Sequence, residues 1–224
     1  MANLSRVVGE TSISMVFLLT LLVAWMSDAD CVGNISEDER PSDVVVIEDV
    51  FFEIVHPPEL EYTYRIRPAQ DFGAPFNASF SERGIALVPV EPATGCRRPD
   101  NADELEGRVA LVWRGDCSFF RKTAIAEDAG AKAIIVADYH KKSIDEERES
   151  PLWMDHYYID MASDNDLSKT RTLNIPAGFL VGKNGRMIKE TLRRLDLRFA
   201  LINIPVNFTF ASLADFHQPP WVVL

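Results

Sequence analysis

Two short apolar segments, separated by the length of one helix, constrain the fold of this chain more than any other feature. The segments are 108–113 (Arg-Val-Ala-Leu-Val-Trp) and 133–137 (Ala-Ile-Ile-Val-Ala). Their length and β-branched residues predict buried strands. Between them, Ser118 can cap a helix that runs to about residue 129, and Gly130 stands where a C-terminal cap belongs. Such a strand–helix–strand unit favours two parallel strands with a right-handed crossover.

The other predicted elements extend this unit into a single mixed α/β (α+β) domain over residues 50–210. Alternating and apolar runs predict five further strands and a second helix, with a turn at 183–185 before that helix. The five strands are expected at 50–55, 62–66, 85–90, 177–181 and 199–204, and the helix at 186–195. Residues 30–49 are acidic and predict a flexible tail, residues 138–174 form a long connection, and residues 211–224 form a C-terminal tail.

Residues 1–29 have the pattern of a secretory signal peptide. Arg6 precedes an apolar run at 13–25, which as a helix is shorter than the ~30 Å hydrocarbon core of a bilayer. Small residues at 27 and 29 then permit cleavage after Ala29. An uncleaved signal anchor is the alternative, because Glu10 and a single arginine make a weak basic region. Cleavage is favoured, and since no later apolar run reaches spanning length, we expect secretion and no membrane span in the mature chain.

Charge and motif content exclude several functions. Asp and Glu outnumber Lys and Arg by 34 to 23, for a net charge of −11, which opposes binding to nucleic acid. Asp164-Asn165-Asp166 resembles the start of a calcium loop, but Lys169 and Ile175 stand where that loop needs Gly and Glu. The histidines have no zinc-binding spacing, and no nucleophile motif is present. We therefore expect no catalytic residue, metal or cofactor. The histidines are His56, His140, His156 and His217.

Secretion makes three glycosylation sequons available, at Asn34, Asn77 and Asn207. Asn207 is expected to be occupied most fully, because its sequon ends in threonine and follows the last predicted strand. Asn77 has phenylalanine neighbours that favour burial, whereas Pro75 favours a loop. Asn34 lies in the acidic tail.

The oxidising secretory pathway also favours a disulfide between Cys96 and Cys117. It closes a loop of about twenty residues, for about 3 kcal/mol in the chain-entropy account. Cys31 is left over, and the sequence leaves open whether it is free, capped or paired between chains.

Three blocks of the chain resemble the protease-associated (PA) domain family: Gly107–Phe119, Ala129–Val136 and Ile175-Pro176-Ala177. They occur in the family's order within a core pattern at 105–204. The flanking segments 68–73, 87–92 and 218–221 are similar to a small secreted glycoprotein of that family. The resemblance implies a β-barrel or sandwich with flanking helices, formed by a PA domain that stands alone. It also places Cys96 and Cys117 at cysteine-bearing positions of the family.

Arg114-Gly115-Asp116 is the integrin-binding tripeptide. Its position at the predicted strand-to-helix turn favours a structural role over adhesion. Gly115 permits the turn, and Asp116 lies near the positive end of the helix dipole.

These observations predict a secreted, non-enzymatic PA-domain protein that acts as an interaction or modulatory module. Its partner would be an unknown secreted or cell-surface protein or peptide. Two alternatives stay open. One is a secreted hydrolase whose catalytic carboxylates are dispersed along the chain. The other is an accessory protein or chaperone of a secreted peptidase.

Overall fold

The computed structural model of the chain describes residues 49–77, 79–138, 159–163, 170–180, 182–206 and 216–222. Within these residues, no helix combines the length and the apolar character that a membrane crossing requires. Several sequence predictions fall outside this part of the chain. They are the signal peptide 1–29, the acidic tail up to residue 48, Cys31, Asn34, the calcium-like loop at 164–166, Asn207, and residues 211–215.

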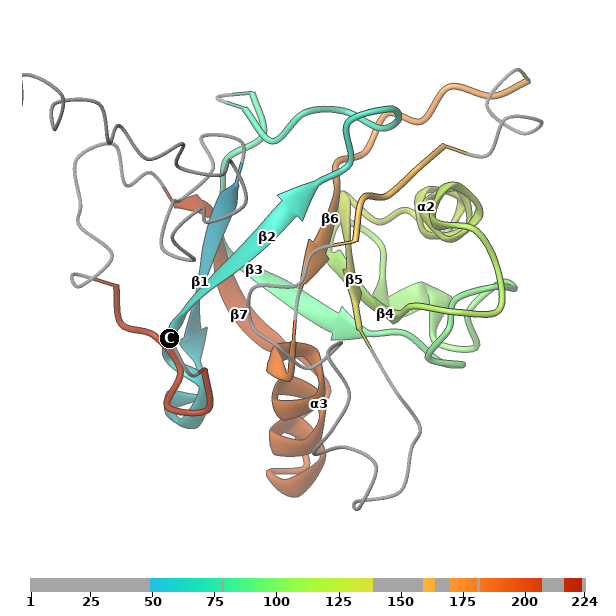
Figure 1. The fold of residues 1–224 in the computed structure, drawn as a ribbon. Coiled ribbons are helices and arrows are strands. Elements are labelled where there is room, and N and C mark those ends of the chain that lie inside the picture. The colour runs from blue at the N-terminus through green and yellow to red at the C-terminus, as the bar shows by residue number, and fades with distance from the viewer. Residues whose placement is uncertain are drawn as a thin grey trace, which may run out of the picture. The chain divides into compact units, whose positions relative to one another are not determined.

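Seven strands close into a barrel in the order β1-β2-β6-β5-β4-β3-β7 (Figure 1). The neighbouring strands from β3 to β6 pair in parallel. Every pairing that involves β1, β2 or β7 is antiparallel. The strands are β1 (Val50–His56), β2 (Thr63–Pro68), β3 (Glu82–Pro89), β4 (Val109–Trp113), β5 (Ala133–Ala137), β6 (Ala177–Leu180) and β7 (Ala200–Val206).

Within the described residues, two α-helices and two short 3-10 helices accompany the barrel. Helix α2 (Phe119–Asp128) lies beside the parallel strands, and α3 (Asn184–Arg194) lies at one end of the barrel (Figure 1). The 3-10 helices are η1 (Pro58–Leu60) and η2 (Ala102–Glu104). The parallel pair predicted from the sequence is confirmed, since β4 and β5 run from Val109 opposite Ala133 to Trp113 opposite Ala137.

The two faces of the parallel strands serve two separate apolar cores, as the alternation of side chains along a strand requires. On β4, Val109, Leu111 and Trp113 belong to the cluster inside the barrel, which Ile188 and Leu192 of α3 complete. The alternate residues Ala110 and Val112 face the outer cluster, which includes Phe120 and Ala126 of α2. The barrel is therefore filled from within and covered by α2 on the parallel side.

The start of α3 differs from the sequence prediction. Residues 183–185 were expected to form a turn, but the helix begins at Asn184. A Cβ on Gly185 would overlap Ala137 and come within 2.9 Å of the Trp113 ring. The glycine is thus required by close helix–strand packing, which a sequence pattern cannot distinguish from the requirement of a turn.

Residues 216–222, within the predicted C-terminal tail, lie against β1 and β2. The amide of Thr63 donates to the carbonyl of His217 at 2.8 Å. The ring of Trp221 meets Tyr62 edge-on at 5.5 Å, and its Nε1 donates to Asn184 Oδ1 at 2.9 Å. This segment therefore connects β2 to the first turn of α3.

Candidate functional site

The turn between β4 and α2 is the first part of the candidate site, and its backbone explains its sequence. Gly115 has φ of 102° and Asp116 has φ of 66°, both in the region that favours glycine. Ser118 then caps α2 by accepting from the amide of Arg121 at 3.2 Å. Arg114 contacts Asp138, with 3.3 Å between Nη1 and Oδ1. The tripeptide 114–116 therefore forms this turn, and its arginine contacts Asp138.

A disulfide joins this turn to the segment that follows β3. Cys96 and Cys117 are bonded, with their Cα atoms 5.8 Å apart, as the sequence predicts. Both cysteines are half-buried, whereas Gly115 and Asp116 beside Cys117 are exposed. The bond therefore lies just beneath an exposed turn.

Lys122 is the residue of this site that the sequence analysis missed. Its side chain is 1% exposed, and its Nζ donates to the carbonyl of Thr94 at 2.5 Å and to that of Gly115 at 2.6 Å. The same Nζ lies 3.3 Å from Cys96 Sγ. Burial lowers the pKa of Lys122 to about 8, against a smaller upward effect of Asp116. At neutral pH the amine is therefore mostly protonated.

A signal for Lys122 was present in the sequence. Phe119, Thr123 and Ala126 have the spacing that places them on one face of a helix, and residue 122 has the i+3 spacing from Phe119 that places it on that same face. A lysine there needs acceptors within the fold. Of the two phenylalanines at the start of α2, Phe120 is the more deeply buried, at 2% exposed, whereas Phe119 is only partly buried.

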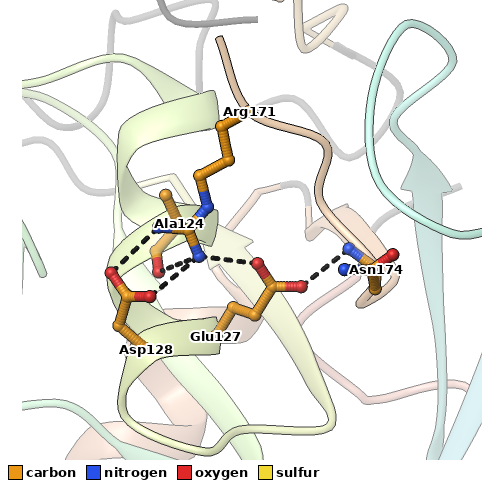
Figure 2. A network of polar contacts seen from close by, with 5 residues as sticks. All are labelled: Ala124, Glu127, Asp128, Arg171 and Asn174. Atoms are coloured by element: carbon orange, nitrogen blue, oxygen red, sulfur yellow. Dashed lines mark hydrogen bonds and ion pairs between the residues drawn. The ribbon is translucent and has the colours of Figure 1, made fainter.

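A second polar cluster lies at the other end of α2 (Figure 2). Arg171 donates to Glu127 Oε2 at 2.7 Å, to both oxygens of Asp128 at 2.9 and 3.0 Å, and to the carbonyl of Ala124 at 3.3 Å. The other oxygen of Glu127 accepts from the amide of Asn174 at 2.7 Å. Bonding to Asp128 and Glu127 raises the pKa of Arg171. This cluster fixes residues 171–174 on the helix.

The structure places one predicted glycosylation site on the surface. Asn77 is exposed, which agrees with the loop that Pro75 favours rather than with the burial that its aromatic neighbours favour. Those neighbours, Phe76 and Phe80, pack edge-on at 5.5 Å and contact the barrel core, so the loop is anchored on either side of the asparagine. Asn77 Oδ1 accepts from the amide of Ser79 at 2.9 Å and also from its hydroxyl.

Across the described ranges, no three His, Cys, Asp or Glu side chains come together as a metal ion would require. His56 and His217 lie in this part of the chain, and His140 and His156 lie outside it. Two groups of polar side chains that the fold brings together are those around Lys122 and those around Arg171.

Comparison with known proteins identifies related chains. Residues 85–188 match the PA domain. A PRADC1-like protein from Drosophila melanogaster is 45% identical over 213 residues, which cover 90% of this chain and 99% of that protein. ER degradation-enhancing alpha-mannosidase-like protein 3 from Homo sapiens is 31% identical over 152 residues, or 68% of this chain and 15% of that protein.

The solved structures with a similar region include two aminopeptidases. They are an aminopeptidase from Aneurinibacillus sp. strain AM-1 (TM-score 0.44, 18% identity) and BSAP, a zinc aminopeptidase from Bacillus subtilis (TM-score 0.40, 16% identity). Each match covers 70% of this chain and 30% of the aminopeptidase chain. The chain thus spans less than a third of these proteins, whereas it covers nearly all of the PRADC1-like protein at 45% identity. On that relationship and the PA match at 85–188, the chain belongs to the PA domain family.

Proposed function

We propose that this chain is a secreted, N-glycosylated PA-domain protein that stands alone and acts as a non-catalytic interaction or modulatory module. The observation that carries the proposal is the relationship to the PRADC1-like protein, which matches this chain over 99% of its own length. Because that relative is matched almost throughout, the relationship supports a function carried by the PA domain itself. Its partner would be a secreted or cell-surface protein or peptide.

Two observations support passage through the secretory pathway. The Cys96–Cys117 disulfide is the kind of bond that persists in oxidising compartments. The name of the human mannosidase-like relative places that protein's role in the ER. Together with the signal-like segment at 1–29, these features favour export.

Export is tested by expressing the full chain in animal cells. The protein should accumulate in the medium with an N-terminus at or near Asp30, because cleavage is expected after Ala29. Recovery from carbonate-washed membranes with Met1 intact would instead establish the signal anchor.

Glycosylation is tested by removing the sequons one at a time. Asn207→Gln should remove most of the glycosidase-sensitive mobility shift, with smaller effects of Asn34→Gln and Asn77→Gln. Position 79 offers a matched pair, because Ser79→Ala should abolish the Asn77 glycan and Ser79→Thr should keep it. Unchanged glycan mass in Asn207→Gln would contradict the expected order of occupancy.

The interaction role is tested by cross-linking the glycosylated protein on living cells and identifying what it captures. Capture should be lost after heat denaturation and should be competed by unlabelled protein. Peptidase, esterase and glycosidase screens on the same preparation should equal a heat-treated control. A reproducible hydrolase activity that one carboxylate substitution abolishes would favour the alternative of a secreted hydrolase.

A further inference from the structure

The ammonium of Lys122 contacts the sulfur of Cys96 within the disulfide, at 3.3 Å. In the intact bond that sulfur is neutral, so the contact stabilises it little. After cleavage of the bond, a thiolate on Cys96 would face a buried positive charge at the same position. Neighbouring cations favour the thiolate form of cysteine and so make it a better leaving group.

The two sulfurs have different electrostatic surroundings. Lys122 Nζ lies beside Cys96 Sγ at 3.3 Å. Although burial lowers the pKa of Lys122, the carboxylate of Asp116 acts to raise it, which favours the positive charge next to Cys96. Both cysteines border exposed residues, at 115–116 and at 97–98, so an external thiol can approach either side of the bond and the charge of Lys122 determines which sulfur leaves. The arrangement favours attack at Cys117 and departure of Cys96.

Lys122 would also hold the segments around Cys96 and Cys117 together after the disulfide is cleaved. Its two carbonyl partners, Thr94 and Gly115, each lie two residues before one of the bonded cysteines. The lysine thus holds the same two segments that the disulfide joins. After cleavage, Cys96 would stay beside the ammonium, so the reaction can be reversed.

We propose that Cys117 is a site of mixed-disulfide formation with a small thiol such as glutathione. The attacking thiolate forms a new S–S bond to Cys117 Sγ, and the Cys96–Cys117 bond breaks. The electron pair of that bond leaves on Cys96 as a thiolate beside the Lys122 ammonium. The sulfur of the attacking thiol is oxidised, the sulfur of Cys96 is reduced, and no proton is transferred in this step.

The first test maps the product on the full chain carrying Cys31→Ser, which leaves Cys96 and Cys117 as its cysteines. The oxidised protein is treated with limiting glutathione at neutral pH, quenched with iodoacetamide and mapped by mass spectrometry. Glutathione should be found on Cys117, with carbamidomethyl on Cys96. The reverse assignment, or no mixed disulfide, would overturn the proposal. This measurement needs no substitution of Lys122.

The second test uses variants of the lysine. Lys122→Gln keeps a hydrogen-bond donor without the charge and should slow opening of the disulfide by glutathione about tenfold, whereas Lys122→Arg should stay within about threefold of the parent rate. Lys132→Gln is the matched control, because Lys132 is exposed and bonds to Glu82; its rate should not change. Thermal unfolding of each oxidised variant verifies the fold. Equal rates for Lys122→Gln and its parent would show that the lysine has only a structural role.

Discussion

Arg171 and Glu127 form an ion pair of 2.7 Å across 44 residues of sequence. The pair fixes the far end of the connection between β5 and β6 onto helix α2. Asp128 and two backbone groups take part in the same cluster (Figure 2). A charged network of this kind is worth more than an isolated surface pair.

Arg171→Met should lower the free energy of unfolding by about 1 kcal/mol, since the arginine side chain is 35% exposed and solvent screens part of its interaction. Arg186→Met is the matched control on α3, where Arg186 pairs with Glu190 one turn away at 2.8 Å. That change should cost no more than about 0.5 kcal/mol. Urea unfolding of both variants measures the two losses in the free energy of unfolding. Equal losses would show that the cluster around Arg171 stabilises the fold no more than the Arg186–Glu190 pair does.

Gly185→Ala should destabilise the fold strongly, because the added methyl would overlap Ala137 and the ring of Trp113. We expect a loss of about 2 kcal/mol or more. Gly115→Ala separates packing from backbone strain, since within the described part of the chain no atom beyond its two sequence neighbours lies within 4 Å of its added Cβ, and its φ is 102°. That variant should lose only about 1 kcal/mol. A smaller loss for Gly185→Ala than for Gly115→Ala would contradict the close packing of α3.

Lys122 should make stability depend on alkaline pH. Its pKa in the fold is about 8, below the ordinary 10.5, so the unfolded chain holds the proton more tightly. The free energy of unfolding therefore rises with pH through this window. Relative to Lys122→Met, the parent should gain up to about 2 kcal/mol between about pH 7 and pH 9.5. Urea unfolding across this range measures the difference, and a constant difference would mean that burial does not lower the pKa.

Replacing both cysteines of the disulfide, as Cys96→Ala with Cys117→Ala, should cost about 3 kcal/mol in the chain-entropy account. The sequence separation of the pair is 21 residues. Differential scanning calorimetry should give a correspondingly lower Tm. A loss below about 1 kcal/mol would show that Lys122 holds the loop closed without the covalent bond.

The strand–helix–strand unit could be predicted because the residues that define it lie close together in the sequence. Apolar runs define β4 and β5, and Ser118 and Gly130 delimit α2 within one or two residues. The barrel was expected from the family resemblance, because the periodicity of apolar residues does not specify whether a sheet closes. The disulfide was also predicted, because Cys96 and Cys117 stand at cysteine-bearing positions of the family that the chain resembles.

The polar clusters could not be predicted in the same way. Arg171 belongs to a connection without a periodic pattern, and its partners lie on a helix more than forty residues earlier. Lys122 finds its acceptors in two turns that only the folded chain brings together. Contacts of this kind depend on tertiary geometry, so a single sequence indicates at most that a charged residue lies on an apolar face.

The closure of the barrel limits how a peptide can bind to it. An open sheet offers an edge whose free N–H and C=O groups can accept a guest strand. In the seven-stranded ring described here, each strand has a neighbour on both sides, so strand addition would require breaking an existing pair. A ligand of the described barrel would therefore have to be recognised through side chains and loops, where sequence differences between relatives can change specificity without disturbing the fold.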